Sequence, residues 1–204
     1  MNQRITGLIL AGGQGTRMGG IDKGLHPFAG KPMIAHVLQR FAPQVGAIAI
    51  NANRNLPSYG QFGVPVWADE PPEGVADFAG PLAGLHTGLV HCKGHAVDYL
   101  ATAPCDSPFL PPELVVALYD ALQAAGAELA VAVTGDARHL HTQPVFSLLK
   151  TALLPQLTQF LQQGGRKVDA WHATLKTVAV HFPDETAFRN INTPEDLRRC
   201  EDGS

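Results

Sequence analysis

ITGLILAGGQGTRMGGIDKG, residues 5–24, is the stretch that decides the fold. Its first part, 5–11, is an apolar run with the length and composition of a buried strand. The run leads directly into a loop with five glycines, which are Gly12, Gly13, Gly15, Gly19 and Gly20. Glycine has no Cβ and adopts positive φ readily, so such a loop can turn its backbone N–H groups toward an anion. Arg17 and Lys23 add positive charge. The pattern predicts a strand followed by a phosphate-binding loop.

Two common phosphate-binding motifs do not fit this loop. A dinucleotide fingerprint begun at Gly13 and Gly15 requires glycine or alanine at the position of Met18. A Walker A loop requires glycine before its lysine, whereas Asp22 precedes Lys23. An NAD-dependent oxidoreductase is therefore disfavoured. A glycine-rich surface loop without a ligand is the remaining alternative, which the preceding strand and the two cations disfavour.

What remains is the pattern LAGGxxxRMGGxDKG, which resembles the signature of nucleotidyltransferases built on a Rossmann-like sheet. In the form AGGQGTRMGGIDKGL it resembles the molybdenum cofactor guanylyltransferases. The resemblance continues in that family's order through GPLAG (80–84), APCD (103–106), QPVF (143–146) and NINTPEDL (190–197). It implies an α/β three-layer sandwich with a mostly parallel sheet, like that of the nucleotide-diphospho-sugar transferases.

Length and composition agree with a compact enzyme. A chain of 204 residues with 45% hydrophobic residues can bury a substantial core without disulfides or a structural metal, and we expect residues 1–204 to form a single domain. A net charge of −3 and a pI near 6.3 provide no positive excess for a nucleic-acid partner. Three cysteines, Cys92, Cys105 and Cys200, form no CxxC pair, which favours a reducing cytoplasm. The apolar N-terminal stretch is too short for a signal peptide or a membrane span.

Strands and helices are predicted to alternate along the rest of the chain. Apolar runs predict strands at 45–50, 64–68, 97–103 and 128–134, and alternation of apolar and polar residues predicts one at 176–182. Residues 143–147 resemble the QPVF strand of the family. Apolar residues at helical spacing predict helices at 32–42, 81–92, 113–125 and 148–163, the last of them interrupted at Pro155. Thr193 and Pro194 fit the cap and first position of a final helix. This order predicts a mostly parallel sheet with right-handed crossovers.

Polar residues follow three of the predicted strands: Asn51, Asp69 and Asp106. In parallel sheets ligands bind beyond the carboxyl ends of the strands, so we expect all three on the same rim as the glycine loop. Ordinary turn chemistry is the alternative for Asn51 and Asp69, and helix capping is the alternative for Asp106. A carboxylate held between prolines at a strand end suits Mg²⁺, which keeps most of its waters.

The family resemblance implies roles for individual residues. Those implied to bind GTP are Leu10, Ala11, Gly12, Gly13, Lys23, Asn51, Asp69, Gly80, Gly84 and Asp106, with the 80–84 segment against the purine. Arg17, Lys23 and Asp106 are implied to act in catalysis, Asp106 as the Mg²⁺ ligand. Those implied for molybdopterin are Arg166, Lys167, Asn190 and Asn192. For Arg166 and Lys167, a solvated basic helix start is an open alternative.

The activity implied by the resemblance is attack by the terminal phosphate of molybdopterin on the α-phosphate of GTP, with release of pyrophosphate. Such a transfer requires positioning and charge neutralisation rather than a covalent enzyme intermediate. Protein partners implied are other molybdenum-cofactor biosynthesis proteins, and apo-molybdoenzymes or their chaperones. One alternative is a cytidylyl or sugar-phosphate nucleotidyltransferase of the same fold, which should lack GGxDKG together with GPLAG. Another is a non-catalytic nucleotide-binding regulator, for which Lys23 and Asp106 would be dispensable.

Overall fold

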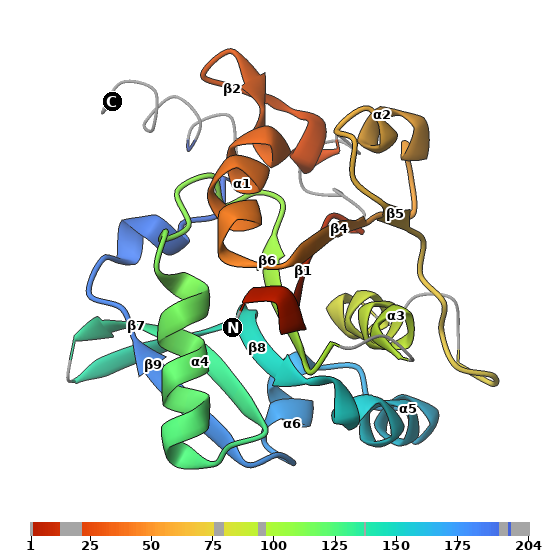
Figure 1. Ribbon diagram of the computed structural model, residues 1–204, viewed down its shortest axis with the longest axis vertical. Helices are drawn as coiled ribbons and strands as arrows, with labels where there is room; N and C mark the ends of the chain where they lie inside the picture. The colour runs from red at the N-terminus through yellow and green to blue at the C-terminus, as the bar shows by residue number, and fades with distance from the viewer. Residues whose placement is uncertain are drawn as a thin grey trace.

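The computed structural model describes residues 2–12, 22–75, 80–93, 97–136, 138–191 and 196. A seven-stranded sheet forms its centre, in the order β5–β4–β1–β6–β8–β7–β9 (Figure 1). The strands are β1 (Ile5–Leu10), β4 (Ala47–Asn51), β5 (Val66–Trp67), β6 (Tyr99–Pro104), β7 (Leu129–Asp136), β8 (His139–Lys150) and β9 (Thr177–His181). In this sheet β8 runs antiparallel to its neighbours, and the other pairs are parallel. The predicted mostly parallel α/β sheet is confirmed.

Helices cover both faces of this sheet. They are α1 (Met33–Phe41), α2 (Leu56–Gly60), α3 (Pro81–Cys92), α4 (Leu114–Ala125), α5 (Leu154–Gln162) and α6 (Val168–His172). Short 3₁₀ turns are η1 (Asn2–Arg4), η3 (Lys23–Leu25), η4 (Ala42–Gln44), η5 (Thr151–Leu153) and η6 (Glu185–Phe188). A small hairpin pairs β2 (Pro27–Phe28) with β3 (Lys31–Pro32).

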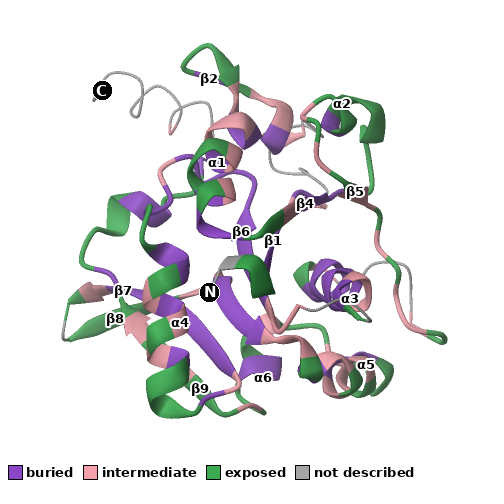
Figure 2. Ribbon diagram, in the orientation of Figure 1, coloured by how far each residue is buried: buried purple, intermediate pink, exposed green. Residues whose placement is uncertain are grey.

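The hydrophobic core lies in two layers, one on each side of the sheet. One layer contains apolar residues of α1 and α4, and the other contains those of α3, α5 and α6. β1 contributes to both, because Ile9 packs into the first layer and Leu8 into the second. This two-sided burial explains why the strand reads as a continuous apolar run. Figure 2 shows the central strands buried and the outer helical surfaces exposed.

The predicted strands and helices are found up to β7, where α2 and the β2–β3 hairpin are additions that were not predicted, and one expectation in the C-terminal half is wrong. β8 continues to Lys150, so 148–150 is strand where a helix was expected. Leu148 and Leu149 point into opposite core layers, and Leu149 pairs with Leu100 of β6. Cross-strand pairing and burial on both faces therefore override the local helical pattern. The helix begins at Leu154, with Pro155 in its first turn, where proline is tolerated.

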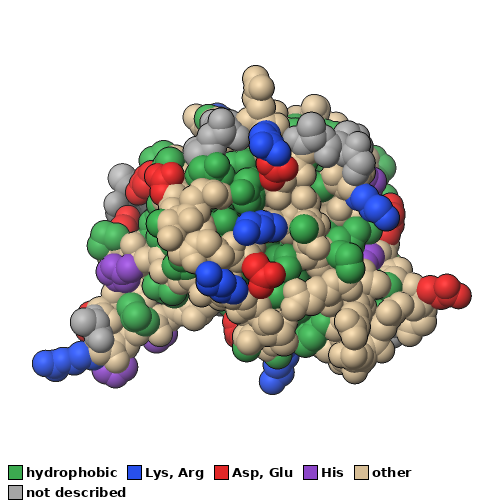
Figure 3. All heavy atoms as spheres, turned by 60° about the horizontal axis from the view of Figure 1, so that its bottom comes forward, with side chains coloured by type: hydrophobic (Ala, Val, Ile, Leu, Met, Phe, Trp, Pro, Cys, Tyr) green, Lys and Arg blue, Asp and Glu red, His purple; other side chains and the backbone are tan. Residues whose placement is uncertain are grey.

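Surface, cysteine and membrane features can be compared with the composition. Positive and negative side chains lie interspersed on the face shown in Figure 3, in keeping with the net charge of −3. Cys92 and Cys105 are free thiols, and burial raises the pKa of both. Cys200 lies outside the described residues. None of the helices in the described ranges has the length and apolar character to cross a lipid bilayer.

Candidate active site

Three neighbouring strands end at the same edge of the sheet. Leu10, the last residue of β1, pairs with Asn51 of β4 on one side and with Pro104 of β6 on the other. The N–H of Ala11 donates to Asn51 O at 2.8 Å, and the N–H of Cys105 donates to Leu10 O at 3.1 Å. The glycine loop therefore starts between Asn51 on the β4 side and the segment after β6. The structure thus brings the expected rim residues together.

On the β6 side of the rim, Lys23 and Asp106 form an ion pair. Lys23 Nζ donates to Asp106 Oδ2 at 3.1 Å, and the side chains are 23% and 10% exposed. The C-terminal segment adjoins this pair, since the N–H of Ile191 donates to Asp106 O at 2.9 Å. Next to it, the Ser107 hydroxyl donates to Asn190 Oδ1 at 2.5 Å. A cation, a carboxylate and a neutral amide therefore lie close together here.

The residue before Lys23 is anchored by α2. Tyr59 donates its hydroxyl to Asp22 Oδ1 at 2.5 Å, and Asn55 Nδ2 donates to Asp22 Oδ2 at 3.0 Å. Tyr59 is fully buried, and this burial raises the pKa of its phenol, so the hydroxyl stays protonated. A Cβ on Gly24 would lie 2.6 Å from the Tyr59 hydroxyl, so only glycine allows this close approach. The backbone on both sides of Lys23 is therefore fixed.

Sequence reasoning missed Tyr59, because no helix was predicted between the strands at 45–50 and 64–68. α2 has only five residues, too few for a clear apolar period. A local signal was present, since Asn55 stands before Leu56–Pro57 and proline is favoured in a first helical turn. Nothing local indicates that the tyrosine reaches Asp22, which lies 37 positions earlier in the chain.

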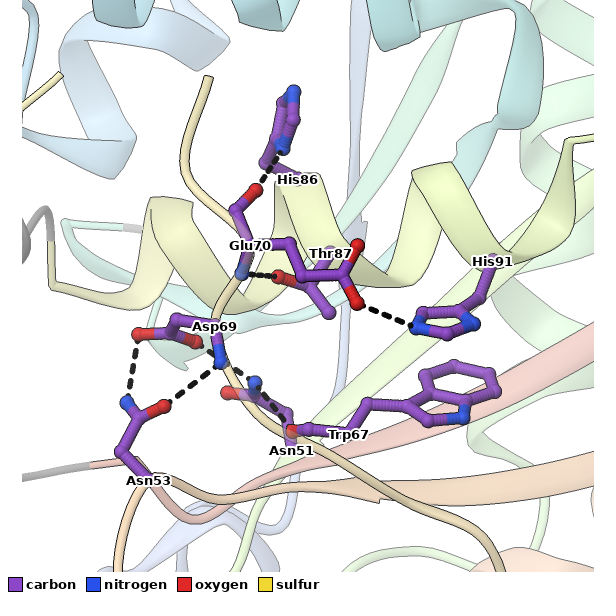
Figure 4. Close-up of polar contacts among 8 residues, drawn as sticks. All are labelled: Asn51, Asn53, Trp67, Asp69, Glu70, His86, Thr87 and His91. Atoms are coloured by element: carbon purple, nitrogen blue, oxygen red, sulfur yellow. Dashed lines mark hydrogen bonds and ion pairs between the residues drawn. The ribbon is translucent and has the colours of Figure 1, made fainter. Parts of the chain in front are cut away.

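On the β4 side of the rim, two amides hold the carboxylate of Asp69. Asn51 Nδ2 donates to Asp69 Oδ1 at 2.8 Å, and Asn53 Nδ2 donates to Asp69 Oδ2 at 2.7 Å (Figure 4). Asn53 also accepts the backbone N–H of Asp69 at 2.8 Å through Oδ1. A Cβ on Gly12 would lie 3.2 Å from Asn53 Nδ2 and 3.4 Å from Asn51 Oδ1. Asp69 is therefore fixed close to the start of the glycine loop.

Glu70, the residue after Asp69, is bonded to three side chains of α3 (Figure 4). The N–H of Glu70 donates to Thr87 Oγ1 at 2.8 Å, and His86 Nδ1 donates to Glu70 O at 2.9 Å. Burial lowers the pKa of His86, which favours the neutral ring. Glu70 Oε1 lies 3.4 Å from His91 Nε2, and the His91 ring stacks on Trp67 with centroids 4.2 Å apart. These contacts fix the 67–70 segment on the helix.

The two glycines expected to contact the purine have different surroundings. Gly80 precedes α3 with φ of 62°, a conformation that favours glycine. Gly84 lies inside α3, where a Cβ would overlap Asn51 Oδ1 and approach Leu10 Cδ2 to 2.7 Å. The small size of Gly84 thus lets α3 pack closely on the rim. This packing already accounts for glycine at position 84. That Gly84 also makes room for a flat base stays a prediction.

The residues expected to receive molybdopterin do not form one cluster in the described contacts. Arg166 Nη1 donates to Leu161 O at 2.9 Å and to Gly165 O at 2.7 Å, so the guanidinium caps the end of α5. Lys167 is exposed and immediately precedes α6. Asn190 adjoins the Asp106 segment, as described above. Asn192 lies outside the described residues, as do Gly13 and Arg17.

The chemistry of the donors can be compared with that required by Mg²⁺. Within the described ranges no group of three or more His, Cys, Asp or Glu side chains is arranged to hold a metal ion. Mg²⁺ usually binds through one or two carboxylates, with the remaining ligands supplied by waters and substrate phosphates. A single carboxylate, that of Asp106, is therefore sufficient for that mode of binding. The site therefore suits an Mg²⁺ ion that is bound jointly with a nucleotide.

Comparison with known proteins identifies relatives over nearly the whole chain. The profile of the MobA-like NTP transferase domain matches residues 7–177. A molybdenum cofactor guanylyltransferase of Cupriavidus taiwanensis is 52% identical over 198 residues, covering 97% of this chain and 96% of the relative. Another from Ralstonia nicotianae is 55% identical over 201 residues, covering 96% and 95%.

Solved structures share the fold. Molybdopterin-guanine dinucleotide biosynthesis protein A from Archaeoglobus fulgidus superposes with a TM-score of 0.72 and 24% identity over 97% of each chain. A 4-diphosphocytidyl-2C-methyl-D-erythritol synthase from Anaerococcus prevotii gives a TM-score of 0.75 and 13% identity, covering 98% of this chain and 95% of that one. At these identities the likeness concerns the fold alone.

Proposed function

The chain belongs to the MobA-like NTP transferase family, and from this membership we propose that it is a molybdenum cofactor guanylyltransferase. It transfers GMP from GTP to the terminal phosphate of molybdopterin and releases pyrophosphate. The observation that carries this proposal is the Lys23–Asp106 pair, located beside the strand that leads into the glycine loop. A cation and a metal-binding carboxylate at this place are what nucleotidyl transfer requires.

In the proposed reaction, a phosphate oxygen of molybdopterin forms a bond to the α-phosphorus of GTP. The bond from that phosphorus to the bridging oxygen of the β-phosphate breaks, and pyrophosphate leaves with the electron pair. Lys23 and Arg17 neutralise charge on the triphosphate, and the backbone N–H groups of Gly12 and Gly13 hold its oxygens. Mg²⁺, held by Asp106, supplies further neutralisation of phosphate charge when bound.

The N-terminal part of the chain binds GTP in this proposal, and the C-terminal part helps to bind molybdopterin. Leu10 and Ala11 contact the nucleotide through backbone groups, while Asn51, Asp69 and the 80–84 segment surround its nucleoside. Asn190 is the best supported of the pterin-binding candidates, because it adjoins the Asp106 segment. Arg166 has a competing role at the end of α5. We place the reaction in a reducing cytoplasm, where Cys92 and Cys105 stay free.

The principal alternative is a cytidylyltransferase, which the shared fold allows. The experiment that decides is to offer the purified protein molybdopterin and Mg²⁺ with GTP, CTP or ATP, and to identify the dinucleotide product by mass spectrometry. We expect the guanine dinucleotide to predominate. Predominant use of CTP would overturn the guanylyl assignment, and binding without any transfer would favour a nucleotide-binding regulator.

A further inference from the structure

The two sides of the rim differ in charge. On the β6 side the ammonium of Lys23 pairs with the carboxylate of Asp106, which holds Mg²⁺ in the proposed function. On the β4 side the amides of Asn51 and Asn53 both donate to the carboxylate of Asp69. An anion repels a triphosphate, so the phosphates belong near Lys23 and the nucleoside belongs near Asp69. Asp69 then faces hydrogen-bond donors of the nucleotide.

In the described part of the chain, the carboxylate of Asp69 uses only part of its capacity to accept hydrogen bonds. Each of its oxygens accepts one amide N–H, from Asn51 at Oδ1 and from Asn53 at Oδ2. A carboxylate offers about four lone-pair sites, so each oxygen retains one further acceptor position. Because each carboxylate oxygen of Asp69 accepts a hydrogen bond, the plane of the carboxylate is fixed. It therefore presents two neighbouring acceptor oxygens in a fixed orientation.

Guanine is the base whose hydrogen-bonding edge matches two neighbouring acceptor oxygens. Its Watson–Crick edge carries the N1–H and N2–H donors side by side, and a carboxylate can accept both. Adenine and cytosine each place an acceptor nitrogen at the corresponding position, which would face the negative oxygen. A fixed carboxylate thus distinguishes guanine both by attraction and by repulsion of the other bases.

Asn53 is the residue that controls this orientation. It contacts Asp69 twice, as donor to the carboxylate and as acceptor of the backbone N–H. Asn51 is buried and also donates to Trp67 O at 3.1 Å, so it serves the fold as well. Asn53 is exposed, and its carboxamide can be removed without opening the core. We propose that Asn53 is a positioning residue for guanine specificity, which it exerts by orienting Asp69 toward N1–H and N2–H of the base.

This proposal rests on the proposed function. Inosine triphosphate (ITP) tests the role of Asn53 separately from that function, because ITP keeps N1–H and the ribose but lacks the 2-amino group. Affinities for Mg·GTP and Mg·ITP are measured by calorimetry. For the wild type we expect GTP to bind about tenfold more tightly than ITP, as one hydrogen bond to a charged group implies. For Asn53→Ala we expect that ratio to fall below about threefold. Gln123→Ala is the matched control, because it removes another exposed amide, one on α4 that donates to the Tyr99 hydroxyl at 2.7 Å. It should keep the wild-type ratio of GTP to ITP affinity.

A double-mutant cycle shows whether Asn53 acts through Asp69. Asp69→Asn should bring the GTP-to-ITP ratio close to one, and adding Asn53→Ala should not change it further. Equal weakening of GTP and ITP by Asn53→Ala would overturn the proposal, since it would indicate loop support or a ribose contact. A further change of the ratio in the double variant would overturn it too. A wild-type protein that prefers CTP or ATP would instead contradict the proposed function.

Discussion

The ammonium nitrogen of Lys23 lies 3.1 Å from Oδ2 of Asp106, although 83 positions separate the two residues in the chain. In the proposed function this carboxylate holds Mg²⁺ and the lysine contacts the triphosphate. Without nucleotide, the lysine and a metal ion therefore compete for the same carboxylate. Binding of the triphosphate relieves the competition, because it offers the ammonium other oxygens.

Removal of the Lys23 charge should therefore strengthen the binding of a metal ion and weaken the binding of nucleotide. In Lys23→Gln we expect Mn²⁺, titrated without nucleotide and followed by electron paramagnetic resonance, to bind about fivefold more tightly. This corresponds to about 1 kcal/mol for a partly exposed pair. The affinity for Mg·GTP should fall, and the melting temperature of the free protein should change little. Unchanged or weaker Mn²⁺ binding would show that the pair does not compete with the metal.

Replacement of Asp106 separates binding from chemistry. Asp106→Asn keeps the shape of the side chain but removes the anionic ligand, so guanylyl transfer should fall by orders of magnitude and the Mg²⁺ requirement should rise. GTP affinity measured without metal should change little. If Asp106 only capped a helix, asparagine would serve about equally well and turnover would stay near normal. Turnover titrated with Mg²⁺ for both proteins distinguishes the two roles.

Tyr59 is expected to act on the site through Asp22. Tyr59→Phe removes the buried hydroxyl that donates to Asp22 Oδ1, and leaves Asn55 as the described donor to that carboxylate. We expect a loss of about 1–2 kcal/mol in the free energy of unfolding by urea, together with weaker GTP binding because Lys23 is held less firmly. Tyr119→Phe, on α4, is the matched control. A variant with lower stability but unaltered GTP affinity would confine Tyr59 to a structural role.

His172 should make stability depend on pH. Its ring is buried, and neither ring nitrogen has a hydrogen-bond partner among the described residues. Burial lowers its pKa from 6.5 to about 4, so the unfolded chain binds more protons between these values. Stability should therefore rise with pH across this range and be lost as pH falls toward 4. Each pKa unit corresponds to about 1.4 kcal/mol, which gives about 3 kcal/mol in total.

His172→Phe tests this expectation directly. Urea unfolding at several pH values between 4 and 7 should show a clearly smaller slope than in the wild type. Part of the slope should persist, because burial also lowers the pKa of His86. His139→Ala, at an exposed position in β8, should leave the profile unaltered. If the pH profile of His172→Phe were identical to that of the wild type, the His172 ring would be either exposed or hydrogen-bonded in solution, and the expectation would be wrong.

Much of the fold follows from short-range patterns. The apolar run at 5–11 predicts a buried central strand, and α3 (Pro81–Cys92) begins and ends where helical spacing and the proline at 81 place it. Asn51, Asp69 and Asp106 could be assigned to one rim, because carboxyl ends of parallel strands share an edge. The 148–150 segment was predicted wrongly, because its apolar residues fit either a helix or a strand buried on both faces.

The sequence by itself determined the alternation of strands and helices, the glycine loop and the residue types at the rim, because these depend on neighbours a few positions apart. Only the tertiary structure decided which polar groups pair. Lys23 meets Asp106 because β6 lies next to β1, Tyr59 reaches Asp22 because α2 packs beneath Gly24, and Asn53 reaches Asp69 because β4 pairs with β5. These contacts join residues 16 to 83 positions apart. Local propensity does not encode such pairs, because they form only after the sheet order has brought their strands together.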